Sequence, residues 1–212
     1  MAKVKLTKGE LKRQRDDLSR FQHYLPTLQL KKQQLQMKIF DARRRLQDKK
    51  EEVDHAREDI RQWAGVLADP EIRREGEEDQ GTADIKKLVL PEDVDLGEEN
   101  IAGVFVPVLR ELTFPPQDYD LYDTPFWVDR AVERLRCLTR LIIETLLIEE
   151  EMRRLNQELR TTTQRVNLFE KVKIPEAQEN IRKIQIYLGD QQANMVGISK
   201  VAKKKIEETM IS

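Results

Sequence analysis

The chain has 212 residues, of which 36% are charged and 39% hydrophobic, and its formal net charge is −1. Globular domains have about 25% charged residues, so this composition argues against a wide globular core and is typical of long helices or coiled coils. No uncharged run approaches the roughly 18 apolar residues of a membrane span, and the single Cys137 excludes a disulfide scaffold. The first residues do not resemble a secretory signal, so we expect a protein of the reducing cytoplasm.

Charges and helix-breaking residues divide the chain into three segments. Residues 1–68 carry 17 basic and 10 acidic side chains, residues 69–124 carry 5 and 16, and residues 125–212 carry 16 and 13. The middle segment also holds five of the eight prolines and four of the eight glycines. The sequence therefore predicts an N-terminal coiled-coil helix at 1–68, an acidic insert at 69–124 and a C-terminal coiled-coil helix at 125–212.

The N-terminal segment repeats every seven residues. Apolar residues recur in one row from Val4 to Leu67, and a second row follows three residues later, as in the a and d positions of a coiled coil. Such a stripe is too narrow to anchor a globular core, so it needs one partner helix of similar length. Pro26 lies inside this pattern and predicts a local bend, because it lacks an N–H. The seam residues selected here are Leu11, Leu18, Leu46 and Val53.

The C-terminal segment supplies the partner helix. Its heptad rows begin after Pro125, shift by one residue near Pro175 and then resume, and we expect a kink or a change in supercoil at the shift. Residues 128–147 are richer in apolar side chains, which predicts packing against the insert as well. The fold is therefore predicted as mainly α, a long antiparallel two-helix coiled coil with a small central β-hairpin insert. The seam residues selected here are Leu155, Leu159, Val166, Ile181 and Leu188.

An antiparallel pair predicts that both termini meet at one end, and that this end is basic. We expect it to face a partner protein or solvent. Nucleic acid is less favoured, because no aromatic residues are interleaved and the chain is not basic overall. The basic residues are Lys3, Lys5, Lys8, Lys12, Arg13, Lys200, Lys203, Lys204 and Lys205.

The insert is predicted to hold short strands at 85–90 and 101–106, a third candidate at 108–114, and a turn at 91–98. Pro107 suits a strand edge or end, and Glu71–Gly81 is predicted to be a mobile acidic loop. A hairpin of this size is marginal alone, so a helix face or a partner must cover its apolar side chains. The residues expected to meet a partner are Val89, Ile101, Val104 and Phe105.

The sequence offers no equipment for catalysis. It has no Gly-rich phosphate loop, no HExxH motif and no metal-spaced Cys/His cluster. His23 and His55 are interpreted as surface residues, Cys137 as a small buried or half-buried side chain, and Glu149–Glu151 as a solvated helix face. We therefore predict no catalytic residues, no cofactor-binding residues and no metal site.

Several segments resemble the D subunit of the V-type and archaeal-type rotary ATPases. They are Leu6–Lys12 (LTKGELK), Glu99–Pro107 (ENIAGVFVP), Arg165–Pro175 (RVNLFEKVKIP) with Asn180-Ile181, and the Lys-rich Lys200–Lys205. They follow the order and spacing of that family, so the resemblance covers nearly the whole chain.

The resemblance implies a central stalk, a rotor shaft that transmits torque between ATP hydrolysis or synthesis in a catalytic hexamer and ion translocation in a membrane ring. It implies as partners the hexamer of A and B subunits, the small F subunit of the stalk and a membrane-ring adapter of the C/d type. The chain itself would be non-catalytic, would bind no nucleic acid, and would lie peripheral to the membrane without inserting into it. The alternatives are the stalk protein of an export-apparatus ATPase and a free-standing coiled-coil scaffold. Proton or sodium coupling, and the direction of the machine, stay open.

Overall fold

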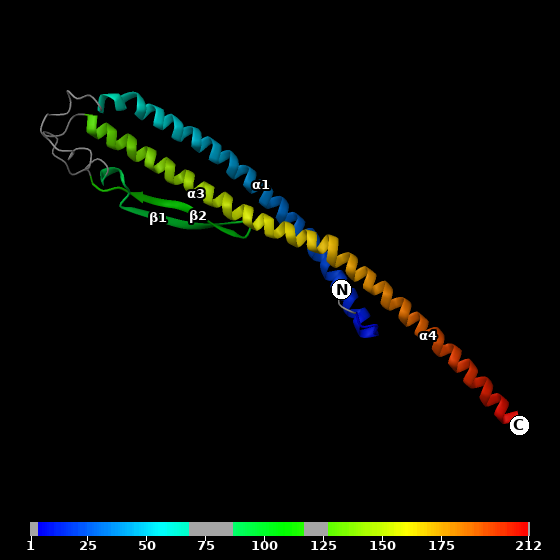
Figure 1. The fold of residues 1–212 in the computed structure, drawn as a ribbon. Coiled ribbons are helices and arrows are strands. Elements are labelled where there is room, and N and C mark those ends of the chain that lie inside the picture. Colours follow the sequence, from blue (N-terminus) through cyan, green and yellow to red (C-terminus); the bar gives the residue numbers. More distant parts are fainter. Residues whose placement is uncertain (1–3, 68–86, 117–126, 212) are drawn as a thin grey trace. The chain divides into compact units, whose positions relative to one another are not determined.

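The computed structural model describes residues 4–67, 87–116 and 127–211, without the side chains of 63–67 and 207–211. Along the chain lie α1 (Lys8–Leu67), β1 (Asp93–Ile101), β2 (Val104–Thr113), α3 (Trp127–Leu168), the π-helical segment η1 (Phe169–Lys173) and α4 (Ile174–Ile211) (Figure 1). Two long antiparallel helices with a small β-hairpin between them confirm the predicted fold. The predicted loop Glu71–Gly81 lies outside the described residues.

The chain forms two compact units, each built from a stretch of both long helices. Unit 1 comprises residues 1–33 and 160–212, and unit 2 comprises residues 34–159. This division crosses the middle of α1, and the three-segment domain organisation stays a prediction.

Burial along α1 follows the two heptad rows. The side chains of Leu35 and Ala42 are fully buried, Ile39 and Val53 nearly so, and the other row positions from 11 to 60 are half-buried. The helix runs without interruption through Pro26, whose side chain is exposed. Thr7 is the N-cap of the helix, because its Oγ1 accepts a hydrogen bond from the Glu10 N–H at 3.2 Å.

In unit 2 the core joins α1 to α3. Leu35 and Ile39 pack with Leu155, and the end of the hairpin adds partly buried residues to this cluster. The hairpin therefore covers the helix pair with its own apolar side chains near Leu155, which lies beyond the stretch 128–147 for which packing against the insert was predicted. The hairpin and α3 residues at the edge of the cluster are Ile101, Ala102, Val104 and Leu159.

Ion pairs connect α1 to α3 along the same unit. Arg45 contacts Glu151 at 2.8 Å, and further pairs join Lys49 to Glu144 at 3.1 Å, Lys50 to Glu149 at 2.8 Å and Asp59 to Arg134 at 2.9 Å. The prediction of a solvated face at Glu149–Glu151 is wrong for Glu151, which is only 6% exposed. Its position on α3 turns the carboxylate toward α1, where Arg45 binds it.

This pair predicts an asymmetry between its two partners. Arg45→Ala should lower the free energy of unfolding by about 1–3 kcal/mol, because a buried carboxylate loses its donor. Glu151→Leu should be nearly neutral, because the half-exposed Arg45 side chain can turn to water. Urea unfolding of both variants measures the difference. Equal losses would contradict the burial of Glu151 as the cause.

The one-residue shift in the C-terminal heptads coincides with η1. The Ile174 N–H donates to the Phe169 carbonyl, an i→i−5 bond that places five residues where an α-helix has four. Phe169 before the shift and Ala177 after it both face the seam of unit 1, and Phe169 packs against Phe21 with ring centroids 5.2 Å apart. The extra residue is thus absorbed by a π-helical turn, a local feature that the heptad pattern did not specify.

Removing one residue from η1 should therefore be tolerated. Deletion of the exposed Lys171 restores the four-residue step between Phe169 and Ile174, so the melting temperature should stay unchanged or rise. Deletion of the exposed Gln22 is the matched control, because α1 has no π turn to release. It should lower stability by about 3 kcal/mol, or about 6–12 °C in melting temperature. A comparable loss for both deletions would contradict the proposed role of η1.

The hairpin differs in register from the prediction. Residues 93–101, predicted largely as a turn, form β1, whereas residues 87–89 form a helical turn instead of a strand. The actual turn is Ala102-Gly103, with φ of 52° and 83°, the backbone of a type I′ turn. The Asn100 Oδ1 accepts a hydrogen bond from the Gly103 N–H at 2.9 Å, and this bond stabilises the turn. This local turn chemistry outweighs the apolar pattern of 85–90.

Strand β2 joins the two segments predicted at 101–106 and 108–114. Pro107 lies inside it and pairs with Glu98, so the proline stands on an edge strand, one of the two predicted positions, and not at a strand end. In a two-stranded sheet each strand has one unpaired edge, where a residue without an N–H is tolerated. A β-bulge between Asp95 and Leu96 shifts the register, so that Asp95 pairs with Glu111 and Leu96 with Leu109.

Candidate interaction surfaces

The residues considered for chemistry lie mostly at the surface. His23 and His55 are exposed, as predicted, whereas Cys137 is exposed instead of buried, because no described residue covers its face of α3. Among the residues that the structure describes, no group of three or more His, Cys, Asp or Glu could hold a metal ion. In the same ranges, no helix is both long and apolar enough to cross a membrane. What the structure does present are surfaces for partners.

Arg136 ties both ends of the hairpin to α3. Its Nε donates to the Leu88 carbonyl at 2.9 Å, before β1, and its Nη2 donates to the Pro115 carbonyl at 2.6 Å, after β2. The guanidinium also lies over the Phe114 ring, 5.2 Å from its centroid. This one planar side chain thus holds both ends of the hairpin against α3.

Arg154 fixes the far end of the hairpin. Its Nη1 donates to the Phe105 carbonyl at 2.8 Å, while its Nε donates to Glu150 at 2.8 Å. Hydrogen bonds from Arg153 and then from Arg154 lower the pKa of Glu150 to about 2. Because this pKa is lowered, the stabilisation is present above the ordinary value of 4.5 and is lost as the pH falls toward 2. Glu150 therefore holds Arg154 in place over most of the pH range.

The Arg136 contacts predict that its loss frees the hairpin without unfolding the helices. Arg136→Ala should accelerate amide hydrogen exchange at residues 93–113 by about tenfold, because two backbone carbonyls lose charge-assisted bonds. Arg136→Lys should recover little of the protection, because an ammonium cannot span both carbonyls and stack on Phe114. Arg134→Ala, which removes only an exposed ion pair to α1, is the control and should leave exchange in the hairpin unchanged.

The residues predicted to meet a partner at the hairpin divide into two groups. Ile101 and Val104 border the helix core, and Val89 is half-buried in the helical turn before β1. Phe105 points the other way and is 58% exposed. The structure adds Leu96, which is 48% exposed and was not predicted, because its segment was interpreted as a turn.

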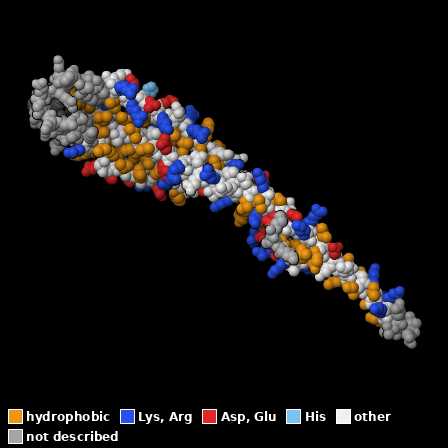
Figure 2. All heavy atoms as spheres, in the orientation of Figure 1, with side chains coloured by type: hydrophobic (Ala, Val, Ile, Leu, Met, Phe, Trp, Pro, Cys, Tyr) orange, Lys and Arg blue, Asp and Glu red, His pale blue; other side chains and the backbone are white. Residues whose placement is uncertain are grey.

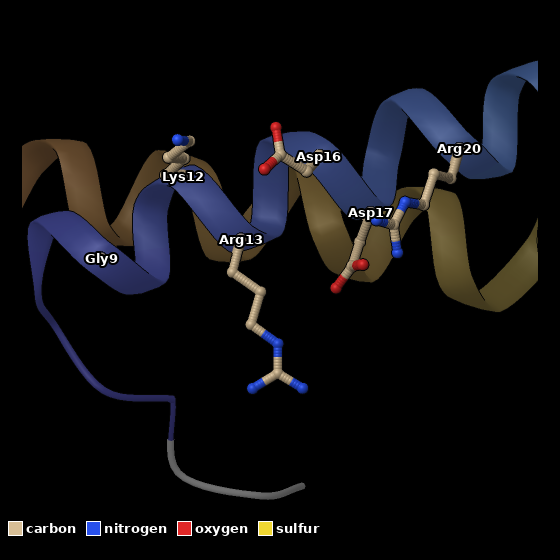
Figure 3. Close-up of a pocket in the computed structure, with 6 residues that line it drawn as sticks. All are labelled: Gly9, Lys12, Arg13, Asp16, Asp17 and Arg20. Atoms are coloured by element: carbon tan, nitrogen blue, oxygen red, sulfur yellow. The ribbon is translucent and has the colours of Figure 1, made fainter.

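The N-terminal basic residues lie among carboxylates. A shallow hollow beside the first turns of α1 is lined by three basic and two acidic side chains (Figure 3). Arg13 and Asp17 project to one side of the helix, and Lys12 and Asp16 to the other (Figure 3). Lys5 and Lys8 are exposed, and Lys3 lies outside the described residues. The lining residues are Gly9, Lys12, Arg13, Asp16, Asp17 and Arg20.

The C-terminal basic residues lie on a part of α4 that α1 does not reach. In unit 1, Asn180 lies beside Gln14, with its Nδ2 3.5 Å from the glutamine Oε1. Helix α1 begins shortly before Gln14, at Lys8, whereas α4 continues to Ile211 (Figure 1). All side chains described from 189 to 206 are exposed, including Lys200 and Lys203–Lys205. The expectation that both basic groups form one end is therefore wrong.

Helix α4 nevertheless continues the heptad rows. After Leu188, the last half-buried position, apolar side chains recur on the exposed helix. This stretch, residues 189–206, is called the free helix below. Its large apolar side chains are Met195, Val196, Ile198, Val201 and Ile206.

Together these features define the class of the protein. It is a two-helix coiled coil with a hairpin that arginine side chains bind to α3, and its α4 continues beyond the paired region. The family model for the D subunit of ATP synthase matches residues 10–204. The chain belongs to this family, the ATP synthase D subunits.

Relatives cover almost the entire chain. The D subunit of the V-type ATP synthase of Borreliella burgdorferi is 40% identical over 97% of this chain and 96% of its own. The D subunit of the V-type ATP synthase of Chlamydia caviae is 36% identical over 98% of this chain and 95% of its own. The protein of the same name from Chlamydia trachomatis serovar L2 is 34% identical over 98% of both chains.

Proposed function

We propose that the chain is the central stalk subunit of a V-type ATP synthase and transmits torque between the catalytic hexamer and the membrane ring. The observation that carries the proposal is membership of the D-subunit family over nearly the whole length, at up to 40% identity. A paired seam with ion pairs between the helices suits torque transmission, because the buried stripe resists separation and the Arg45–Glu151 pair resists sliding.

In unit 1, the free helix engages the hexamer of A and B subunits. It carries apolar side chains in heptad phase and basic residues at Lys200 and Lys203–Lys205, and unit 1 leaves both groups exposed. The basic residues on both helices were expected to form one contact surface, and the contact with the hexamer is thus assigned to the part of α4 past Leu188. The residues near the start of α1, which include Lys8, Lys12 and Arg13, contact the same hexamer closer to its edge.

Unit 2 engages the small F subunit of the stalk and the membrane-ring adapter of the C/d type. The exposed side of the hairpin and the outer faces of α1 and α3 are the surfaces available for them. The chain works there as a non-catalytic subunit, peripheral to the membrane on its cytoplasmic side.

Isolation of the complex through a tag on the full-length chain tests this function. The two kinds of hexamer subunit and the small stalk protein should co-purify, and ATP hydrolysis should reside in the complex and not in the isolated chain. A chain that ends at Leu188 should retain the small stalk protein but lose most of the hexamer. Full-length Gly197→Ala is the control, because it changes the free helix without shortening it and has open space around the added methyl group.

Two results would contradict the proposal. One is a full-length chain that brings down no ATP-hydrolysing hexamer. The other is steady hydrolysis by the purified chain alone, unchanged by further purification.

A further inference from the structure

The hairpin has an inner and an outer face, and the pairing assigns residues to each. Directly paired residues share a face and alternate along a strand, so Phe105 and Leu109 of β2 lie with Asn100 and Leu96 of β1. Val106 lies on the opposite face and is only 1% exposed, so that face is turned toward the helices. The face with Phe105 and Leu96 is the outer one.

This outer face is apolar at its centre. Phe105 and Leu96 are exposed, and Leu109 and Pro107 are half-buried beside them. Figure 2 shows hydrophobic side chains gathered over α3 and the hairpin, with Asp and Glu along the border. Large exposed apolar side chains that adjoin one another on a small sheet are typical of a surface that another molecule covers.

The hairpin that carries this face is strongly acidic, and Glu98 lies on the outer face itself. Between residues 92 and 113 the only basic residue is Arg110. None of the acidic side chains described between residues 92 and 113 is paired with Lys or Arg. An anionic lipid surface or a nucleic acid would be repelled, whereas a protein surface with Lys and Arg would be attracted. The exposed acidic residues are Glu92, Asp93, Asp95, Glu98, Glu99 and Glu111.

The face is also held in one orientation. Arg136 fixes the two ends of the hairpin, and Arg154 binds the Phe105 carbonyl from α3. The bond from Arg154 holds β2 against α3. A surface whose backbone is already fixed loses little conformational entropy on binding.

We propose that the outer face of the hairpin, centred on Phe105 and Leu96, docks a protein that presents apolar side chains ringed by Lys and Arg. The proposal rests on the proposed function only in assigning this partner to the same complex. Phe105 and Leu96 enter the partner's apolar patch, while Glu98 meets its basic ring.

Hydrogen exchange of the full-length chain, free and within the tagged complex, tests the proposal. Exchange at residues 93–113 should slow by about tenfold or more in the complex. Phe105→Ser and Leu96→Ser should each abolish this protection, and Phe105→Tyr should retain it. Glu98→Lys should reduce it, with the greater loss at low salt, where the attraction between charges is strongest. Phe40→Ser, which changes an exposed phenylalanine on α1, should leave it intact.

A photoreactive phenylalanine analogue at position 105 identifies the occupant. The expected cross-link joins this chain to another protein of the complex, within a segment that contains Lys or Arg. Exchange in the free Phe105→Ser chain must match the wild type, which shows that the variant hairpin is folded, and Leu96→Ser provides the same test from the other strand.

Three results overturn the inference. Unchanged exchange at 93–113 in a complex that otherwise assembles refutes the docking face and leaves the proposed function standing. A cross-link only to a second copy of this chain refutes the stated partner. A tagged chain that isolates no other protein of the complex refutes the proposed function together with this inference.

Discussion

The constraint on which the structure depends is the narrowness of the apolar stripe on each long helix. Every a and d position of α1 from 11 to 60 is at least half-buried, and most other positions are exposed. Such a stripe can be buried only against another stripe, so each unit must pair α1 with a segment of α3, η1 or α4. An extra residue between two seam positions must then be accommodated without turning the next seam residue away from the partner helix. The π-helical turn at η1 does this. The outer faces of the helices stay available for partners.

A seam of similar side chains does not by itself fix how far one helix slides along the other. In unit 2 the polar contacts supply that information. Exposed ion pairs such as Lys50–Glu149 contribute little stability. Glu151 is different, because a buried carboxylate away from Arg45 would be left without a donor, which penalises every shifted pairing. Arg136 acts likewise on the hairpin, since its carbonyl partners meet in only one position.

The sequence predicts the features that repeat and misses those that depend on single distant contacts. The heptads give both long helices, their antiparallel pairing and the site of the phase shift near Pro175. The hairpin register depends on Asn100 and Gly103, which a search for apolar segments overlooks. The role of Arg136 is invisible in sequence, because its acceptors are backbone carbonyls 48 and 21 residues away. The two basic ends are separated because α4 extends past the start of α1.

The free helix connects stability to function. Its heptad rows continue through Met195 and Ile198, yet no described residue of this chain covers them. Two glycines, Gly189 and Gly197, each cost about 1 kcal/mol of helix stability relative to alanine. In the proposed function, the partner that covers the free helix offsets this cost by burying its apolar rows. Binding then also stabilises the helical segment that the partner holds.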